Sequence, residues 1–166
     1  MTIDESIKQY GKRLYGLCLT LCADKTDADD LYQDTWLKVV RHIAQYDSTK
    51  NFEPWLTRIC VNTYRNRLRR QSKSPIYDGF SSVESKDAVM ETVVVAPKED
   101  YTDLHAAINQ LPEKLRVTII LFYFKDMDLK STADLLSIPA GTVKSRLNKA
   151  KKLLKEALKH EYDLQF

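Results

Sequence analysis

The chain has 166 residues, of which 43% are hydrophobic and 30% charged, and its formal net charge is +3 at pH 7. That much apolar material is sufficient for a packed core and argues against a wholly disordered chain. No apolar run approaches the roughly 20 residues of a membrane span, and the N-terminal Met-Thr-Ile-Asp-Glu does not resemble a signal peptide, so we expect a cytoplasmic protein without direct membrane insertion.

The first two predicted helices carry apolar side chains at helical spacing. The first spans residues 6–22, and the second begins after Thr26, which we expect as its N-cap, and runs to about Gln45. The positions of the second helix that we expect to face the core are Ala28, Leu31, Tyr32, Thr35, Trp36, Val39, Val40 and Ile43.

A third helix follows a polar loop with one isolated aromatic residue. The loop spans residues 46–53, and Pro54 suits the first position of a helix over residues 54–71. This helix becomes cationic toward its end, with no acid in between. Its cations are Arg58, Arg65, Arg67, Arg69, Arg70 and Lys73.

Helical periodicity is lost between residues 72 and 101, where acids outnumber lysines and Ser, Pro and Gly are frequent. We expect a flexible acidic linker over residues 72–101. The apolar run Val93-Val94-Val95 within it is unusual for a free linker and is a candidate docking segment. Helices resume over residues 102–111 and 112–125, the second opening with Pro112 as its first residue.

The stretch from Asp128 to Lys152 is predicted to form a helix-turn-helix. Asp128 suits an N-cap, and Pro139 ends the first helix because it cannot continue it. Seven cations and one anion stand between Ala140 and His160. Solvated helices usually intersperse both signs, so this segregation favours DNA binding over a merely soluble surface.

These elements predict an all-α protein with two small helical domains, residues 1–71 and 102–166, joined by the linker. Each domain ends in a basic helix, which indicates two DNA contacts some distance apart.

The sequence contains no P-loop and no nucleophile–base constellation, so we do not expect an enzyme. Because Cys18, Cys22 and Cys60 lie in apolar helical patterns, we expect reduced core thiols, and no metal or cofactor.

Three segments, in this order, resemble the extracytoplasmic-function (ECF, group 4) sigma factors of bacterial RNA polymerase. Asp29–Leu37, D-D-L-Y-Q-D-T-W-L, is similar to the family's region 2.2, and Trp55–Asn62, W-L-T-R-I-C-V-N, is similar to regions 2.3 and 2.4. Leu111–Lys114, leading to I-P-A-G-T-V-K-S-R-L at Ile138–Leu147, is similar to region 4. The resemblance covers both predicted domains.

The resemblance implies a protein that binds core RNA polymerase, recognises minus-35 and minus-10 promoter elements, and promotes melting and transcription initiation in response to a stress or envelope signal. The residues that it places on the β′ clamp helices are Asp30, Leu31, Gln33, Asp34 and Trp36. Leu31 and Trp36 are equally well explained as core residues. Asp30 and Asp34 share one helical face, where like charges repel, so this face suits a cationic partner.

The resemblance also implies two sets of DNA contacts. The minus-10 candidates are Lys50, Phe52, Asn62, Arg65, Asn66 and Arg69. The minus-35 candidates are Thr142, Lys144, Ser145, Arg146, Asn148 and Lys149. Many family members have Asp in place of Asn66, an aliphatic residue in place of Thr132 and Gly in place of Ser137. Gly141 serves either the turn or a close approach of the backbone to DNA.

The partners implied are promoter DNA, core RNA polymerase through its β′ clamp helices and β flap, and a membrane-anchored anti-sigma factor. The alternative is a stand-alone helix-turn-helix transcription regulator that binds duplex DNA without polymerase. Such a regulator needs neither the acidic second helix nor the basic third helix, so the sequence favours the sigma factor.

Overall fold

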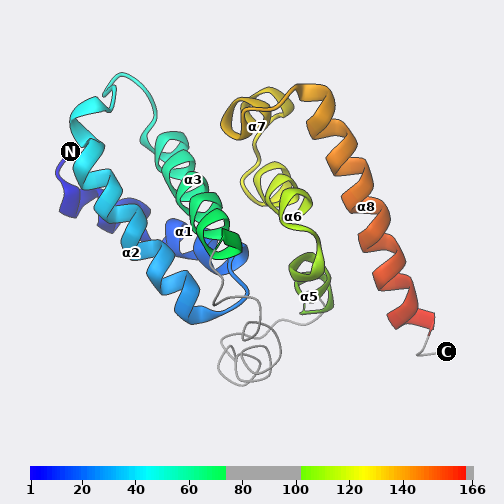
Figure 1. Cartoon of the computed structure of the whole chain (residues 1–166). Helices are drawn as coiled ribbons and strands as arrows, with labels where there is room; N and C mark the ends of the chain where they lie inside the picture. The colour runs from blue at the N-terminus through cyan, green and yellow to red at the C-terminus, as the bar shows by residue number, and fades with distance from the viewer. Residues whose placement is uncertain (74–101, 164–166) are drawn as a thin grey trace. The chain divides into compact units, whose positions relative to one another are not determined.

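The computed structural model describes residues 1–73 and 102–163, and every regular element in these two ranges is helical (Figure 1). The chain divides into two compact units, Met1–Ala96 and Pro97–Phe166. The expected all-α fold with two helical domains is confirmed, whereas the domain limits at residues 71 and 102 stay predictions. The predicted linker and its Val93-Val94-Val95 run lie outside the described residues.

The first unit contains α1 (Ile3–Leu21), α2 (Lys25–His42), the short 3₁₀ helix η1 (Ile43–Gln45) and α3 (Phe52–Lys73). The helix α1 begins three residues earlier than predicted, because a capping box at Thr2 closes its first turn. The Thr2 hydroxyl accepts from the Glu5 N–H at 3.2 Å, and the Glu5 carboxylate accepts from the Thr2 N–H at 2.7 Å.

The N-cap of α2 is Asp24, so the prediction of Thr26 was wrong. Asp24 has an extended backbone, and its carboxylate accepts from the Asp27 N–H at 2.8 Å. Thr26 lies inside the helix, one position after its first residue. Asp24 and Thr26 have similar preferences for the N-cap position. Asp24 occupies it because its carboxylate reaches a free backbone N–H group of the first turn.

The core of the first unit is apolar and contains all three cysteines. Its buried members include Leu14, Leu17, Cys18, Leu21, Cys22, Ala28, Leu31, Val39, Leu56, Cys60 and Val61. The sulfur atoms of Cys18 and Cys60 lie 3.8 Å apart, and this thiol contact, together with burial, raises the pKa of Cys18. The three cysteines are free thiols. Val40, expected in the core, is 50% exposed, because the adjacent Val39 takes the inward position.

The helix α3 begins at Phe52, two residues before the predicted start at Pro54. The Phe52 ring is 3% exposed. It packs against Tyr10, Tyr46 and Trp55 with ring centroids 5.1, 5.3 and 5.5 Å away. The sequence had indicated an isolated aromatic residue in a loop. In the structure, Phe52 is a core residue at the start of the helix.

The second unit contains α5 (Thr102–Gln110), α6 (Glu113–Ile119), η2 (Ile120–Phe124), α7 (Leu129–Leu136) and α8 (Ala140–Asp163). Pro112 precedes α6 as its N-cap and is not the first helical residue. The described residues include no helix with the length and apolar character to cross a membrane.

The predicted helix over residues 112–125 is not uniformly α. Its second half, η2, is a π-helix, in which the Lys125 N–H donates to the Ile120 carbonyl at 3.1 Å. The wider turn keeps Ile120 and Leu121 fully buried while Tyr123 and Phe124 are 45% and 43% exposed. Short π-helices are rare and leave no simple periodicity in a sequence.

Candidate functional site

The turn between α7 and α8 positions the second helix of the helix-turn-helix. Asp128 caps α7 by accepting from the Ser131 N–H at 2.7 Å, as predicted. At the other end of α7, Ser137 adopts the left-handed conformation with φ 56°. The chain then enters α8 at once, and the N–H groups of Thr142 and Val143 donate to the Pro139 carbonyl at 3.0 and 3.2 Å.

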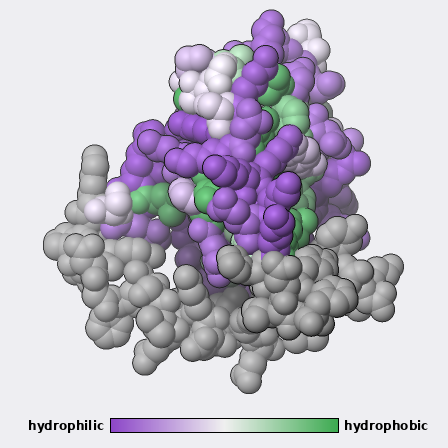
Figure 2. Space-filling view, turned by 90° about the vertical axis from the view of Figure 1, so that its right-hand side faces the viewer, coloured by the Kyte–Doolittle hydropathy of each residue, from purple (hydrophilic) through white to green (hydrophobic). Residues whose placement is uncertain are grey.

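The two faces of α8 differ in chemistry. Its inward face consists of Val143, Leu147 and Ala150, which are at most 5% exposed. Hydrophilic side chains dominate the view of the molecule from the side of α8 (Figure 2). Four of the six minus-35 candidates are exposed, and the other two are half-buried at the edge of that face. The exposed ones are Lys144, Ser145, Asn148 and Lys149, and the half-buried ones are Thr142 and Arg146.

Gly141 is the second residue of α8 and has no positive φ. The turn itself is made by Ser137, so the conformational explanation of Gly141 does not hold. A Cβ atom built on Gly141 would meet no heavy atom within 4 Å. The N-terminal end of α8 is therefore sterically open at this position.

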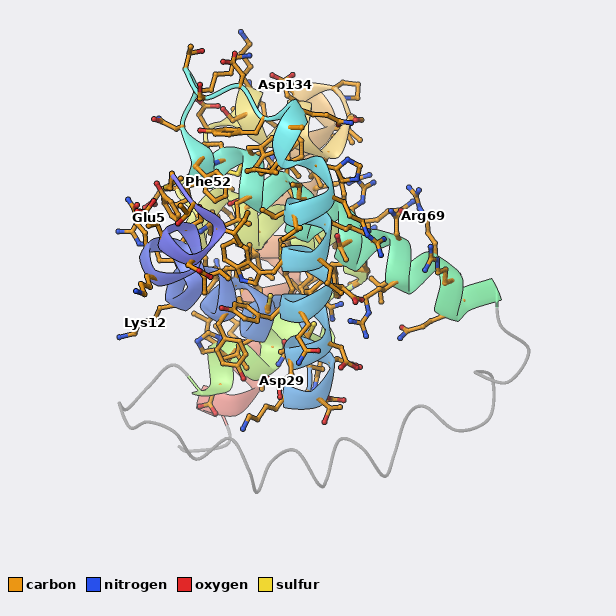
Figure 3. The ribbon with its side chains drawn as sticks, turned by 90° about the vertical axis from the view of Figure 1, so that its left-hand side faces the viewer. Glu5, Lys12, Asp29, Phe52, Arg69 and Asp134 are labelled. Atoms are coloured by element: carbon orange, nitrogen blue, oxygen red, sulfur yellow. The ribbon has the colours of Figure 1, made fainter. Side chains whose placement is uncertain are left out.

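The minus-10 candidates on α3 lie three or four residues apart and share one face of the helix. Asn62, Asn66 and Arg69 are exposed, and Arg65 is half-buried. Arg69 projects away from the packed part of the first unit (Figure 3). Amide and guanidinium groups can pair with base edges or phosphates, so this face has the chemistry of a nucleic-acid contact.

The loop before α3 is held by its own hydrogen bonds. The Asp47 carboxylate accepts from the backbone N–H and the hydroxyl of Thr49 at 3.0 and 2.6 Å, and these bonds lower the pKa of Asp47. The Tyr46 hydroxyl donates to the carbonyl of Lys50. The Lys50 side chain is exposed, whereas Phe52 is buried beneath the loop. Of the two loop candidates, only Lys50 is accessible to DNA in this conformation.

The polymerase candidates on α2 separate into two groups. Asp30 and Gln33 are exposed, and the Asp34 side chain is 50% exposed. Leu31 is fully buried and Trp36 is 7% exposed, so burial supports their interpretation as core residues. Leu37, at 56% exposure, lies on the same face as Asp30 and Gln33 and is not among the predicted docking residues.

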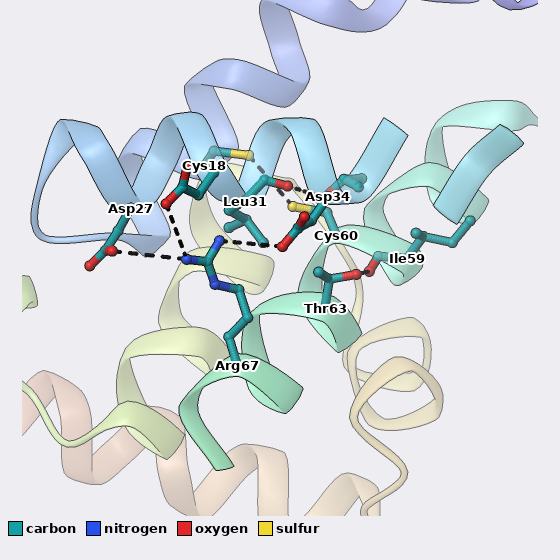
Figure 4. Close-up of polar contacts among 10 residues, drawn as sticks. Cys18, Asp27, Leu31, Asp34, Ile59, Cys60, Thr63 and Arg67 are labelled. Atoms are coloured by element: carbon teal, nitrogen blue, oxygen red, sulfur yellow. Dashed lines mark hydrogen bonds and ion pairs between the residues drawn. The ribbon is translucent and has the colours of Figure 1, made fainter. Parts of the chain in front are cut away.

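A cation within the chain already contacts the acidic face of α2. The Arg67 guanidinium on α3 lies 3.9 Å from Asp27, 3.7 Å from Asp30 and 3.6 Å from Asp34 (Figure 4). Burial raises the pKa of Asp27, with a further contribution from Asp24, and Arg67 opposes the rise. The sequence showed the acids on one helical face and Arg67 among the cations. Residue spacing within one helix cannot predict an ion pair with another helix.

Groups of three or more His, Cys, Asp or Glu side chains that could hold a metal ion do not occur among the described residues. The exposed faces carry amide, guanidinium and ammonium groups on α3 and α8, and carboxylates on α2. These are the groups of binding surfaces.

The family models match both units. Residues 7–74 match Sigma-70 region 2, and residues 101–154 match Sigma-70, region 4. These two regions place the chain in the class of RNA polymerase sigma factors. They also cover the three exposed faces described above, since α2 and α3 lie in the first match and most of α8 in the second.

Curated relatives narrow the class. The chain is 31% identical over 157 residues to the ECF RNA polymerase sigma factor SigM of Bacillus subtilis, with 93% of this chain and 94% of the relative covered. It is 26% identical over 160 residues to the ECF RNA polymerase sigma factor SigW of the same organism, covering 90% and 85%. The chain belongs to the ECF RNA polymerase sigma factors.

Solved structures share the fold. The sigma factor RpoE of Bartonella quintana, determined in complex with the anti-sigma factor NepR, matches with a TM-score of 0.76 at 24% identity, covering 94% of this chain and 96% of that one. CnrH, determined in complex with the cytosolic domain of CnrY, matches with a TM-score of 0.66 at 19% identity, covering 95% and 88%.

Proposed function

We propose that this ECF sigma factor docks on core RNA polymerase with the acidic face of α2, reads a minus-10 element with α3 and a minus-35 element with α8, and so directs transcription initiation. The observation that carries the proposal is the division of each of these helices into an apolar buried face and a polar outer face. The outer faces of α3 and α8 are cationic and amide-rich, as DNA contacts require, and that of α2 is acidic.

At the minus-35 element, α8 enters the major groove with Lys144, Ser145, Asn148 and Lys149 toward the bases and phosphates. These four residues are exposed together on one side of the helix. Thr142 and Arg146, half-buried at its edge, contact the sugar-phosphate backbone beside the groove. The open space around Gly141 permits close approach of a phosphate to the start of α8, where helix N–H groups favour anions.

At the minus-10 element, Asn62, Arg65, Asn66 and Arg69 present one polar face of α3 to the DNA. Exposed Lys50 contributes from the preceding loop. Phe52 acts indirectly, because its buried ring supports Tyr46 and Trp55 at the base of that loop. Unpairing of the element is assisted if an extruded base finds a pocket formed by the loop.

On the polymerase side, Asp30, Gln33 and Asp34 meet the β′ clamp helices, whereas the β flap binds the second unit. Leu31 and Trp36 hold α2 in place from within the core and make no direct contact. Half-exposed carboxylates on a rigid helix suit basic side chains of a partner and increase the rate of association.

An anti-sigma factor regulates the protein by covering these surfaces until a signal releases it. The support is that RpoE, which shares the fold, was solved in complex with the anti-sigma factor NepR, and CnrH in complex with the cytosolic domain of CnrY. We infer a membrane-anchored partner for this chain, and co-purification with the product of the neighbouring reading frame is the test. Recovery of the chain free of that product, in cells that make both, would contradict this inference.

The central experiment is run-off transcription with reconstituted holoenzyme on the promoter of the chain's own operon. We expect a defined transcript that requires both core polymerase and the chain. Asp30→Arg should lose core binding in a pull-down while keeping its helical circular dichroism. Asp4→Arg, an equal charge change at an exposed position of α1, should bind normally. Absence of both binding and transcript for the wild-type chain would overturn the proposal.

A further inference from the structure

The contacts of Arg67 are ion pairs and not hydrogen bonds. Its three N–O distances to Asp27, Asp30 and Asp34 all exceed the range of a hydrogen bond. The buried Nη1 atom has no hydrogen-bond partner. The guanidinium thus neutralises the acids from a short distance without engaging the lone pairs that a partner would use.

The carboxylates remain available from the outside. Their side chains are 49%, 57% and 50% exposed for Asp27, Asp30 and Asp34, whereas that of Arg67 is 23% exposed. Arg67 therefore lies on the inner side of the carboxylates and leaves their outer side to solvent. A basic side chain of a partner that approaches from solvent would share the same carboxylates with Arg67.

Two opposite roles follow from this geometry. Arg67 either holds the carboxylates in position for the partner, or competes with it by supplying positive charge at the same place. The backbone of α2 is fixed independently, because Leu31, Thr35 and Val39 are fully buried in the core. With the helix already rigid, positioning adds little, whereas the charge lies within 4 Å of both docking carboxylates.

We propose that Arg67 is an internal counter-ion that weakens docking of a cationic partner on Asp30 and Asp34. This inference rests on the proposed function, in which the partner is core RNA polymerase. Arg67 lowers the net charge of the three-carboxylate cluster and so moderates the affinity of the free sigma factor for polymerase. It also joins α3, the helix proposed to read DNA, to the surface proposed to bind polymerase.

The test is a titration of fluorescently labelled full-length chain with core RNA polymerase at low and high salt. Arg67→Gln should bind about three- to tenfold more tightly at low ionic strength. The gain in affinity should shrink at about 0.5 M salt, because the Debye length is then only a few ångströms. Arg67→Lys retains the charge and should bind like the wild type. Weaker or unchanged binding of a folded Arg67→Gln chain would overturn the inference.

The matched control is Arg13→Gln, which removes another arginine from an ion pair in the same unit. Arg13 pairs with Glu53 at 3.1 Å and not with the acids of α2, so its loss should leave the affinity unchanged. An equal gain for Arg13→Gln would overturn the inference, because only the overall charge of the chain would then matter. A gain shared by Arg67→Lys would do so too, because geometry and not charge would be responsible.

Asp34→Asn separates failure of the inference from failure of the proposed docking face. If Asp34→Asn weakens polymerase binding and Arg67→Gln does not strengthen it, the docking face stands and the counter-ion role is wrong. If neither substitution changes the affinity, the docking face itself is wrong. Circular dichroism and urea unfolding of each variant establish that the compared chains are folded.

Discussion

The backbone N–H of Ile138 donates to the carbonyl of Ala133 at 3.1 Å and closes the turn between α7 and α8. Between these two residues, the Ser137 N–H donates to the Asp134 carbonyl at 3.3 Å, while Ser137 itself is left-handed, with φ 56° and ψ 46°. This pair of bonds is the Schellman pattern of helix ends, in which the left-handed position is usually glycine. The orientation of α8 thus depends on a strained serine.

Ser137→Gly should stabilise the second unit by about 1 kcal/mol, because glycine enters the left-handed region without the Cβ penalty. The measurement is urea unfolding of the full chain, followed by circular dichroism. Ser131→Gly makes the same chemical change inside α7, where glycine is unfavourable, and should destabilise by about 0.5–1 kcal/mol. Destabilisation by both variants would show that the backbone at Ser137 carries no strain.

Thr132→Val should also stabilise the second unit, by about 1 kcal/mol. Thr132 is fully buried, and its hydroxyl oxygen has no hydrogen-bond partner. Valine has nearly the same shape and removes an unsatisfied buried polar group. Thr118 is equally buried, but its hydroxyl donates to the Lys114 carbonyl at 2.7 Å. Thr118→Val should therefore give no gain, and urea unfolding of both variants checks the contrast.

Local signals predicted the helix-turn-helix well. The cap at Asp128 and the apolar face of Val143, Leu147 and Ala150 depend on neighbours within a few residues. Pro139 does not end the first helix as predicted, because α7 already ends at Leu136 and Pro139 stands directly before α8. The sequence located the turn, and the comparison with the family's usual glycine pointed to Ser137. Only the structure shows that Ser137, and not Gly141, carries the left-handed conformation.

The features that the sequence did not predict depend on contacts between distant segments. Whether Val39 or Val40 faces inward on α2 is decided by packing against the other helices, and both fit the same pattern. Arg67 meets acids about 30 to 40 positions earlier in the chain, and periodicity within one helix carries no information on that pairing. The sequence predicts Phe52 in a loop, because the aromatic cluster that buries it includes Tyr10 of another helix.

The two glycines of α1 should respond differently to alanine. Gly16 is exposed, and a Cβ there would meet nothing within 4 Å, so Gly16→Ala should stabilise by about 0.5–1 kcal/mol through helix propensity. At Gly11 a Cβ would lie 2.9 Å from the Tyr32 hydroxyl. The Tyr32 ring packs against Tyr15 and Trp36 at 5.6 and 6.2 Å and resists displacement.

Gly11→Ala should therefore show no gain in thermal unfolding, or a loss. Adding Tyr32→Phe removes the hydroxyl that the new methyl group would meet, so the double variant should recover stability relative to Gly11→Ala alone. Failure of this recovery would locate the obstacle elsewhere in the packing of α1 against α2.

The cap of α7 makes the stability of the second unit depend on pH at the acidic end. Hydrogen bonds from Ser131 lower the pKa of Asp128 below its ordinary value of 3.8. A carboxyl whose pKa is lower in the folded state contributes stability above the unfolded value, and this contribution is lost as the pH falls through the folded value. Asn caps helices about as well as Asp but does not titrate.

Wild type and Asp128→Asn should thus be similarly stable near neutral pH, and the wild type should lose stability relative to Asp128→Asn as the pH falls below about 3.8. Urea unfolding over a pH series measures the difference. A constant difference throughout, or an NMR titration of the Asp128 carboxyl at its ordinary pKa, would contradict the role of this cap.

The two kinds of position on α8 should differ in how they affect promoter choice. Asn148 is exposed on the outer face, whereas Arg146 is half-buried at its edge. If the proposed docking is right, Asn148→Ala should weaken holoenzyme binding by about 1–3 kcal/mol on the preferred minus-35 sequence and much less on a mutated one, because it reads a base. Arg146→Ala should weaken binding to both sequences alike and reduce the salt slope by about 1, because it contacts a phosphate.

Binding of reconstituted holoenzyme to the two promoters at several salt concentrations distinguishes these outcomes. The control for loss of charge is Lys155→Ala, which changes an exposed lysine further along α8. A promoter-dependent effect of Arg146→Ala would instead place its guanidinium in the groove, against a base edge.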